Sequence, residues 1–454
     1  MKVVSKKSVL AGHIVVPGSK SHTIRSLILA AMGDGVSHIY NPLRSNDCLS
    51  TVEAIRKIGA EVTMEDDCWT VTGAGQNLHI PEGPINVGNS GSLMYFLAPV
   101  LATLKGECTF TGDESICKRP VGHLLDALKQ LGVKTKSLNH NNMPPFVFTG
   151  PMTLGKSNNG VLHTEGALSQ YISGFMMAAA RLDGTLEIEL ENPQETPYLT
   201  MTKYWLENVG VKADISEDFK KISVSGSSAV KSFDKVIPSD WEGIAFPLIS
   251  ALLSCSEITI DNVDSSGTQG DAAIVEILKS VGANIIWNTD SSTLAVKKTK
   301  RLSTKGLPKK VLRIDISAFP DAICALSVIS CFIEGKTIIS NVGICRQKET
   351  DRVTAMTEIL TSLGADIKDE GDSLVIMGHS QFNEDGIQNP LCKLHGGKID
   401  IMKDHRIAMA LACFGLGLKN GEAVEIKDGE CCDVSFPHFF GEMNKLGANF
   451  GLSE

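Results

Sequence analysis

Hydrophobic and polar positions follow one pattern six times along the chain. An almost wholly apolar helix with a small-residue start leads through a short turn into a strand, as in "SLMYFLAPVLATLKGECTFTGD". An amphipathic helix follows and ends in a near-identical stop, which reads IRKIGAEV, LKQLGVKT, LENVGVKA, LKSVGANI, LTSLGADI and MNKLGANF in turn. The glycine of each stop stands where a helix C-cap needs a positive φ. The pattern predicts a β-α-β-α-β-β unit of about 65 to 85 residues, repeated six times.

The first helix of each unit is apolar nearly all round, so we expect it to be buried, while the second covers the outside. The fold class is therefore α/β, with three buried helices in each of two domains. Each helix N-terminus carries about half a positive charge. Two triplets of such N-termini facing across a cleft predict a site for anions.

Residues at the helix starts agree with anion binding. The start "PGSKSHTIR" combines a small-residue turn with hydroxyls and basic groups, whereas "GNSGSLMYF" has Tyr95 as its next large polar residue and nothing basic until Lys105. Lys348 and Arg352 are four residues apart, so we expect them to share one helix face, with Glu349 beside it. The basic candidates are Lys20, Arg25, Arg119, Lys348, Arg352 and Arg406, and the acidic candidates are Asp321 and Glu349.

Taken singly, each candidate has a simpler explanation. Asp321 could cap a helix, and the charged segment around Glu349 could be a solvated turn. Together, an acidic pair within a basic cluster predicts proton transfer on polyanionic substrates.

Composition narrows the function further. The chain has 454 residues and a formal net charge of −9, which disfavours general attraction to nucleic acid or acidic membranes. Twelve cysteines without metal-type spacing suggest reduced thiols in the cytoplasm and no metal site. We see no signal peptide and no apolar run of membrane-spanning length.

Eight segments resemble the 5-enolpyruvylshikimate-3-phosphate (EPSP) synthases, in the same order and over essentially the whole chain. They are PGSKSHTIR, GNSGS, KRPVGHL, SQYISGFMMAAA, PYLTMT, PDAICAL, RQKETDRVTAM and DHRIAMALA. The related UDP-N-acetylglucosamine enolpyruvyl transferases are less similar, because Glu114 occupies the place of their reactive cysteine and Cys117 is displaced from it.

The resemblance implies two inverse α/β domains, each a threefold repeat, with the active site in the cleft between them. Domain one would span 19–236 and bind the acceptor, and domain two would combine 1–18 with 237–454. The family transfers an enolpyruvyl group from phosphoenolpyruvate to a ring hydroxyl of a cyclic carboxylic acid and releases phosphate. The resemblance implies no cofactor, and we expect a monomer.

The resemblance also implies a role for each matching residue. Asp321 would take the proton of the attacking hydroxyl, and Glu349, with Lys20, would add and remove the proton on the methylene carbon. Phosphoenolpyruvate would be held by Lys20, Gly91, Arg119, Gln170, Arg352 and Arg406. The acceptor would be held by Ser21, Arg25, Ser169, Gln170, Tyr198, Asp321 and Lys348.

The chain departs from the family pattern around this centre. The family usually has arginine at Tyr95, lysine at Val434, serine at Leu168 and Glu195, and asparagine at Ile344. In the fourth apolar helix, Trp241-Glu242-Gly243 replaces a small polar pair. Losing two basic side chains predicts weak binding of a phosphoenolpyruvate mimic such as glyphosate.

By the resemblance, the replaced serines contact the 3-phosphate of the acceptor. A carboxylate about 4 Å from each unit of phosphate charge would cost on the order of 4 kcal/mol. Alternatively, Glu195 points outward and neighbouring groups replace the lost donors. Three functions follow: the family reaction, the same or an elimination reaction on a ring without the 3-phosphate, or a catalytically silent protein that binds an anion.

Overall fold

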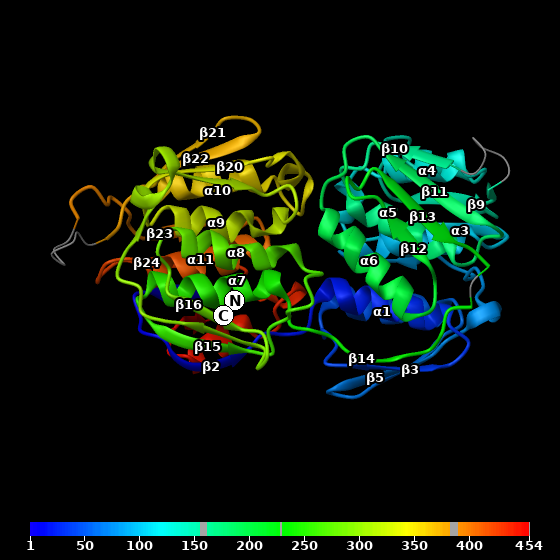
Figure 1. Ribbon diagram of the computed structural model, residues 1–454, viewed down its shortest axis with the longest axis horizontal. Helices are drawn as coiled ribbons and strands as arrows, with labels where there is room; N and C mark the ends of the chain where they lie inside the picture. The colour runs from blue at the N-terminus through cyan, green and yellow to red at the C-terminus, as the bar shows by residue number, and fades with distance from the viewer. Residues whose placement is uncertain (155–160, 228, 382–388, 454) are drawn as a thin grey trace. The chain divides into compact units, whose positions relative to one another are not determined.

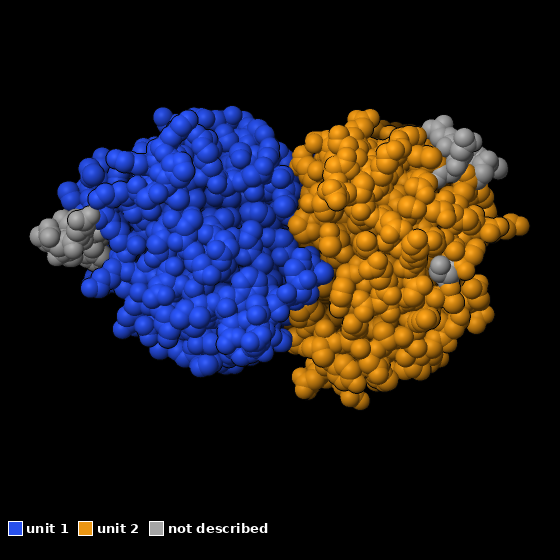
Figure 2. All heavy atoms as spheres, in the orientation of Figure 1, with its two compact units in different colours: residues 1–17, 239–454 blue, residues 18–238 orange. Residues whose placement is uncertain are grey.

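A computed structural model of the protein describes residues 1–154, 161–227, 229–381 and 389–453. The chain divides into two compact units, coloured separately in Figure 2. Unit 1 combines residues 1–17 with 239–454, and unit 2 comprises residues 18–238. Each unit contains three copies of the repeat predicted from the sequence. Figure 1 labels many of the helices and strands.

Unit 2 is built around three helices that are buried along nearly their whole length. These core helices are α1 (Lys20–Met32), α3 (Gly91–Ala102) and α5 (Ser169–Ala179). Each is followed by a second helix with exposed polar positions. These second helices are α2 (Asn46–Lys57), α4 (Gly122–Gln130) and α6 (Thr196–Asn208). The burial pattern agrees with the predicted division into inner and outer helices.

Three four-stranded sheets cover the core of unit 2. In spatial order, the first holds β14 (Asp234–Val236), β3 (Val36–Tyr40), β5 (Cys68–Thr72) and β4 (Glu61–Met64). The second holds β6 (Ile85–Asn86), β7 (Gly106–Thr111), β9 (Phe146–Gly150) and β8 (Lys134–Ser137). The third holds β10 (Val161–Thr164), β11 (Thr185–Leu190), β13 (Lys221–Ser225) and β12 (Ala213–Ile215). In each sheet the first pair is parallel and the other pairs are antiparallel.

Unit 1 repeats this plan. Its core helices are α7 (Trp241–Leu253), α9 (Ile323–Ser330) and α11 (His405–Leu416). Its second helices are α8 (Ile274–Ser280), α10 (Arg352–Ser362) and α12 (Phe439–Lys445). One sheet holds β2 (Ala11–Val15), β15 (Glu257–Asp261), β17 (Thr293–Val296) and β16 (Ile285–Asn288). Another holds β18 (Leu302–Ser303), β20 (Ile333–Ser340), β22 (Ser373–Gly378) and β21 (Asp366–Asp369), with β19 (Val311–Asp315) also paired to β20.

The last sheet explains why the N-terminus belongs to unit 1. It runs β23 (Gly397–Ile399), β24 (Ala423–Ile426), β1 (Lys2–Lys6) and β25 (Gly451–Ser453). Strand β1 lies between strands from the C-terminal repeat and is antiparallel to both. Strand β2 pairs in parallel with β15 of the fourth repeat. The first residues of the chain therefore complete two repeats of the C-terminal half.

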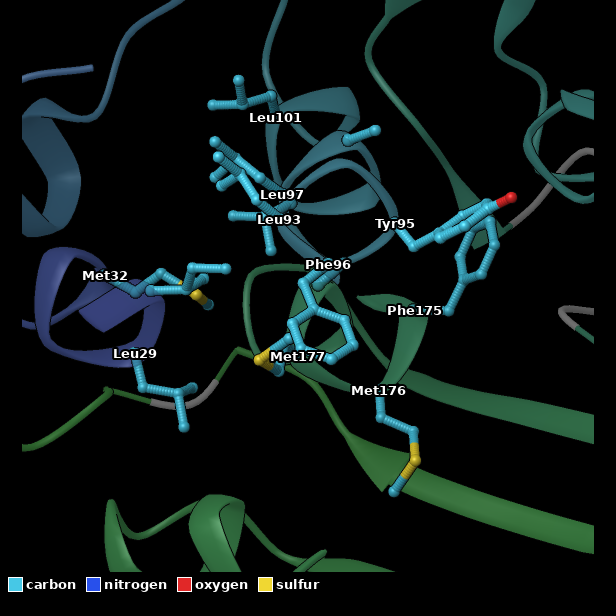
Figure 3. Close-up of a cluster of buried hydrophobic side chains, with 14 of the residues drawn as sticks. Leu29, Met32, Leu93, Tyr95, Phe96, Leu97, Leu101, Phe175, Met176 and Met177 are labelled. Carbon is cyan, nitrogen blue, oxygen red and sulfur yellow. The ribbon is translucent and has the colours of Figure 1, made fainter. Parts of the chain in front are cut away.

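The core of unit 2 forms where α1, α3 and α5 meet (Figure 3). Phe96, Leu97 and Met177 are buried there, with exposed fractions of 1% or less. Gly174 of α5 allows this close packing, because a Cβ at this position would clash with the carbonyl oxygen of Tyr95. The apolar runs of the sequence thus serve helix-to-helix packing inside the unit.

The predicted helix stops are confirmed. The glycines of the six stops have φ values between 81° and 111° and are Gly59, Gly132, Gly210, Gly282, Gly364 and Gly447. A residue with a Cβ is disfavoured in this conformation, which explains the repeated glycine. None of the helices in the described ranges combines the length and apolarity needed to cross a membrane. No disulfide joins any of the twelve cysteines, all of which the structure describes.

Candidate active site

The start of α3 gathers three of the predicted phosphoenolpyruvate ligands. Gly91 is the first residue of α3, and a Cβ there would lie 3.1 Å from Nη1 of Arg119 and 3.9 Å from Oε1 of Gln170. Arg119 donates from Nη2 to Oδ1 of Asn89 at 2.8 Å. Gln170, in the first turn of α5, donates to Oγ of Ser92 at 3.1 Å. Arg119 therefore brings a cation to the helix start that lacks one in its own sequence.

Tyr95 stands in α3, where the related family usually has arginine, and it supports the segment that carries Arg119 and Pro120. Its hydroxyl donates to the carbonyl of Pro120 at 2.9 Å, next to Arg119. Its ring stacks on His123 with centroids 5.5 Å apart, and His123 in turn lies 4.7 Å from Tyr171. Burial lowers the pKa of His123 to about 4, so this imidazole is neutral near pH 7. Tyr95 thus replaces a charge with a fixed aromatic support.

Lys20 begins α1 and is partly exposed. Its Nζ lies 3.3 Å from Oδ2 of Asp47, a buried residue in the first turn of α2. This pairing was not expected from the sequence, because the two residues lie in different helices and nothing local marks Asp47 as a partner. The ion pair fixes the position of the Lys20 ammonium.

Arg25 lies deep in unit 2, with an exposed fraction of 1%. Its guanidinium lies 4.5 Å from the ring centroid of Phe96 and donates from Nε to Oγ1 of Thr202 at 2.8 Å. Further bonds reach the Ser21 carbonyl, the Tyr198 carbonyl and Ser173. Burial lowers the pKa of Arg25 to about 9, while the nearby Tyr198 and Glu195 act in the opposite direction. Arg25 thereby hydrogen-bonds the backbone carbonyls of both Ser21 and Tyr198 from a buried position.

Glu195 points into unit 2, so the alternative that it points outward is wrong. Its side chain is 2% exposed, and Oε2 accepts bonds from the backbone N–H and the hydroxyl of Ser169 at 3.1 and 2.9 Å. Ser169 is the first residue of α5, so the carboxylate lies at the positive end of that helix. Glu195 takes a left-handed conformation with φ of 51° directly before α6. Leu168 precedes Ser169 and is half-buried.

Unit 1 places the two acidic candidates on one guanidinium. Arg352 is fully buried and donates from Nη1 to Oδ1 of Asp321 at 2.5 Å and from Nη2 to Oε2 of Glu349 at 2.6 Å. Lys348 donates to Oδ2 of Asp321 at 3.2 Å. Asp321 therefore joins an ion-pair network, and the helix-cap explanation is wrong: Phe319 and Ala322 occupy the adjacent cap positions.

Asp404 is buried and holds Arg352 of this network in place. Its side chain is fully buried, accepts from Nε of Arg352 at 2.8 Å, and accepts from the backbone N–H of Arg406 at 2.9 Å as the N-cap of α11. Burial disfavours the charged form of Arg352, but Asp404, Glu349 and Asp321 outweigh burial and raise its pKa well above the ordinary value. Arg352 therefore remains a cation.

The predicted helix face carrying Lys348, Glu349 and Arg352 is wrong. Helix α10 begins only at Arg352, and Lys348 is extended, with φ of −80° and ψ of −154°. Asp351 sets this start, because its Oδ1 accepts the backbone N–H of Thr354 at 3.0 Å. The three side chains still converge, because Lys348 and Arg352 both pair with Asp321 and Glu349 pairs with Arg352.

Arg406 is the second residue of α11 and is 3% exposed. Its Nε lies 3.3 Å from Oδ1 of Asp321, and its Nη2 pairs with the carboxylate of Glu242 in the first turn of α7. Sequence reasoning noted Glu242 as a departure but gave it no partner. Asp240 is the N-cap residue of α7 but makes no side-chain cap bond, and Oε1 of Gln269 accepts the Trp241 N–H instead.

The two remaining departures lie in short helical turns. Ile344 is 5% exposed within the turn Gly343–Gln347, and Val434 ends the turn Gly429–Val434. Among the residues that the structure describes, no group of three His, Cys, Asp or Glu side chains is placed to hold a metal ion.

The predicted site residues thus divide between the units. Unit 2 contributes Lys20, Ser21, Arg25, Gly91, Arg119, Ser169, Gln170 and Tyr198. Unit 1 contributes Asp321, Lys348, Glu349, Arg352 and Arg406. Of these predicted residues, those of unit 2 are cations and residues at helix starts, and those of unit 1 include both members of the acidic pair with their own cations.

The chain is similar to known enzymes over nearly its whole length. Residues 4–443 match the family model of EPSP synthase (3-phosphoshikimate 1-carboxyvinyltransferase). The chain is 35% identical over 449 residues to the 3-phosphoshikimate 1-carboxyvinyltransferase of Acetivibrio thermocellus, covering 99% of both chains. It is also 35% identical over 452 residues to the enzyme of that name from Methanocaldococcus jannaschii, covering 98% of both. The solved EPSP synthase of Acinetobacter baumannii aligns over 100% of this chain and 99% of its own, with a TM-score of 0.82 and 25% identity.

Proposed function

The chain belongs to the EPSP synthase family, and we propose that the residues gathered in its two units carry out that family's reaction. The reaction transfers the enolpyruvyl group of phosphoenolpyruvate to 3-phosphoshikimate and releases phosphate. The observation that carries the proposal is the pair Asp321 and Glu349, both held on the buried guanidinium of Arg352. This arrangement places two proton-transfer groups beside fixed positive charge.

The proposed steps use each carboxylate once per half-reaction. The acceptor hydroxyl attacks C2 of phosphoenolpyruvate and gives its proton to Asp321, while C3 receives a proton from Glu349. The tetrahedral adduct then returns a proton from C3 to Glu349, and its phosphate leaves C2 with the proton held by Asp321, which restores the double bond as an enol ether and both carboxylates to their starting forms. Lys348, Arg352 and Arg406 surround Asp321 with positive charge.

Binding is assigned to the basic groups and helix starts of both units. Arg119 and Gln170 meet at Gly91, and guanidinium groups suit phosphate and carboxylate oxygens. Lys20, Arg352 and Arg406 complete the proposed set for phosphoenolpyruvate. The acceptor is assigned to Ser21, Arg25, Ser169, Tyr198 and Lys348, of which Arg25 positions Ser21 and Tyr198 from beneath. A cytoplasmic location and a monomeric state remain predictions from the sequence.

Two substitutions test the roles of the acidic pair. Asp321→Asn and Glu349→Gln keep size and shape but remove the proton-accepting group, so each should lower kcat by about a hundredfold or more. Glu442→Gln removes the same charge from the ion pair with Lys445 on the outer helix α12 of unit 1 and should leave kcat unchanged. Circular dichroism verifies that all three variants fold. Wild-type kcat in both Asp321→Asn and Glu349→Gln would contradict the assignment.

A second candidate acceptor, a cyclic acid without the 3-phosphate, is favoured by the position of Glu195. Its carboxylate already occupies the start of α5 and the hydroxyl of Ser169, where an external anion would otherwise bind. A phosphate beside it would meet like charge, at a cost on the order of 4 kcal/mol per unit charge at about 4 Å.

Kinetics with two acceptors separate the candidates. If the second is correct, wild-type protein has a higher kcat/KM for shikimate than for 3-phosphoshikimate, and Glu195→Gln raises kcat/KM for the phosphorylated acceptor alone. If 3-phosphoshikimate is the acceptor, it is preferred by the wild type and Glu195→Gln brings no such gain.

A further inference from the structure

Seven charged side chains of unit 1 form one connected network. Ion pairs link Lys348, Arg352 and Arg406 to Asp321, Glu349, Asp404 and Glu242. Three cations therefore face four carboxylates. A carboxylate that pairs with one of these cations competes with a bound anion for it, unless the fold or the reaction requires that carboxylate.

The carboxylates differ in what they do. Asp404 caps α11 and anchors Arg352, so it has a structural task. Asp321 and Glu349 are the proposed proton-transfer groups. Glu242 is neither a cap nor a proposed proton carrier, and its carboxylate pairs with Nη2 of Arg406. It is the member of the network whose charge the reaction does not require.

The fold holds Glu242 against Arg406. Glu242 is the second residue of α7, where the helix N-terminus favours a negative side chain. The Glu242 side chain is 9% exposed and that of Arg406 is 3% exposed, so water screens the pair weakly. An anion that binds Arg406 must either displace this carboxylate or approach it closely.

We propose that Glu242 is an intramolecular competitor for the anion-binding position at Arg406, which weakens the binding of phosphoenolpyruvate and of the phosphate product. The inference rests on the proposed function, which assigns Arg406 to phosphoenolpyruvate. Glu242 thereby sets a high working concentration for this substrate and favours departure of phosphate. It is a specificity-determining residue that acts through Arg406.

The test compares ligand binding in the wild type and in Glu242→Gln, which keeps the side-chain length and removes the charge. Isothermal titration with phosphoenolpyruvate, and separately with inorganic phosphate, should show Kd lowered about tenfold or more, equivalent to ~1.4 kcal/mol. The KM for phosphoenolpyruvate should fall in parallel, with little change in the KM for the acceptor. Glu425→Gln is the matched control, because it removes one negative charge from the Lys2 ion pair on β24 of the same unit.

Two outcomes of these titrations would overturn the inference. If Glu242 merely orients Arg406, Glu242→Gln raises the Kd for phosphoenolpyruvate, and that result overturns the inference. An unchanged Kd, or a gain no larger than that of Glu425→Gln, overturns it too. Should Glu242→Gln not fold, Glu242→Ser undergoes the same titrations.

Turnover by the wild type tests the proposed function separately. Absence of phosphate release would contradict that function, whereas the ratio of Kd values between Glu242→Gln and the wild type tests the competition alone.

Discussion

The buried contact between Asp404 and Arg352 predicts a sharp difference between two helix caps. Asp404 caps α11 and Asp351 caps α10, both in unit 1. Asp404 is fully buried against Arg352, whereas the Asp351 side chain is 40% exposed and lies 3.3 Å from Arg346. Replacing each aspartate by asparagine keeps a good N-cap and removes the charge. The pair of variants therefore isolates the value of the buried charge.

The expected magnitude follows from the contacts of each carboxylate. In Asp404→Asn, one orientation of the amide turns its NH2 towards the Nε–H of Arg352, and the other turns it towards the N–H of Arg406. Losing a hydrogen bond to a charged group costs about 1.5 to 3 kcal/mol, and leaving a buried charge without its partner costs about 3 to 5 kcal/mol. Since Arg352 keeps Asp321 and Glu349, we expect a loss of about 3 kcal/mol. Asp351→Asn should cost less than about 1 kcal/mol, as for an exposed pair.

Urea unfolding followed by circular dichroism measures both losses. The midpoint should fall clearly for Asp404→Asn and hardly at all for Asp351→Asn, with the m-value unchanged in each. Equal losses in the two variants would refute the view that Asp404 holds Arg352 by a buried charge.

Two further predictions concern Asp271 and Tyr95. Burial, reinforced by Asp321 and Asp240, raises the pKa of Asp271 well above 3.8, so the folded state retains a proton that the unfolded state loses as the pH rises. This contribution is fully present below the unfolded pKa and is lost as pH rises through the folded pKa. Asp271→Asn should therefore gain stability over the wild type as the pH rises above about 4, measured by urea unfolding, and a constant difference would contradict the shift. Tyr95→Phe removes the bond to the Pro120 carbonyl, so unfolding free energy should fall by about 1 kcal/mol and the KM for phosphoenolpyruvate should rise as Arg119 loosens. A fall in stability with an unchanged KM would show that Tyr95 supports the fold without positioning Arg119.

Much of the fold could be predicted because the repeat makes each local signal appear six times. The apolar run that became α3 and the glycine stop at Gly132 are weak evidence singly, but their recurrence fixes helix order and burial. The cation missing from the start of α3 could not be located in the same way. It comes from Arg119, which is 28 positions further along the chain from Gly91 and reaches it only through tertiary folding.

The candidate site residues could be named from the sequence and stay predictions, whereas their geometry could be predicted less well. Asp321 and Glu349 were named as the acidic pair, but the segment before Arg352 is a loop, because Asp351 starts the helix later than its spacing suggested. The inward direction of Glu195 and the pairing of Glu242 with Arg406 depend on contacts between segments distant in sequence. No periodicity or motif encodes such a contact, so the sequence marked both residues as departures without revealing their partners.

Phosphate release from phosphoenolpyruvate tests the central claim most directly. The purified protein is mixed with phosphoenolpyruvate and 3-phosphoshikimate, and phosphate is measured together with the enol ether product by mass spectrometry. A parallel reaction contains shikimate, and a third contains no acceptor. We expect phosphate and enol ether in equal amounts with a cyclic acid acceptor, and no phosphate release without an acceptor. If neither 3-phosphoshikimate nor shikimate gives phosphate and enol ether, enolpyruvyl transfer by this chain is contradicted.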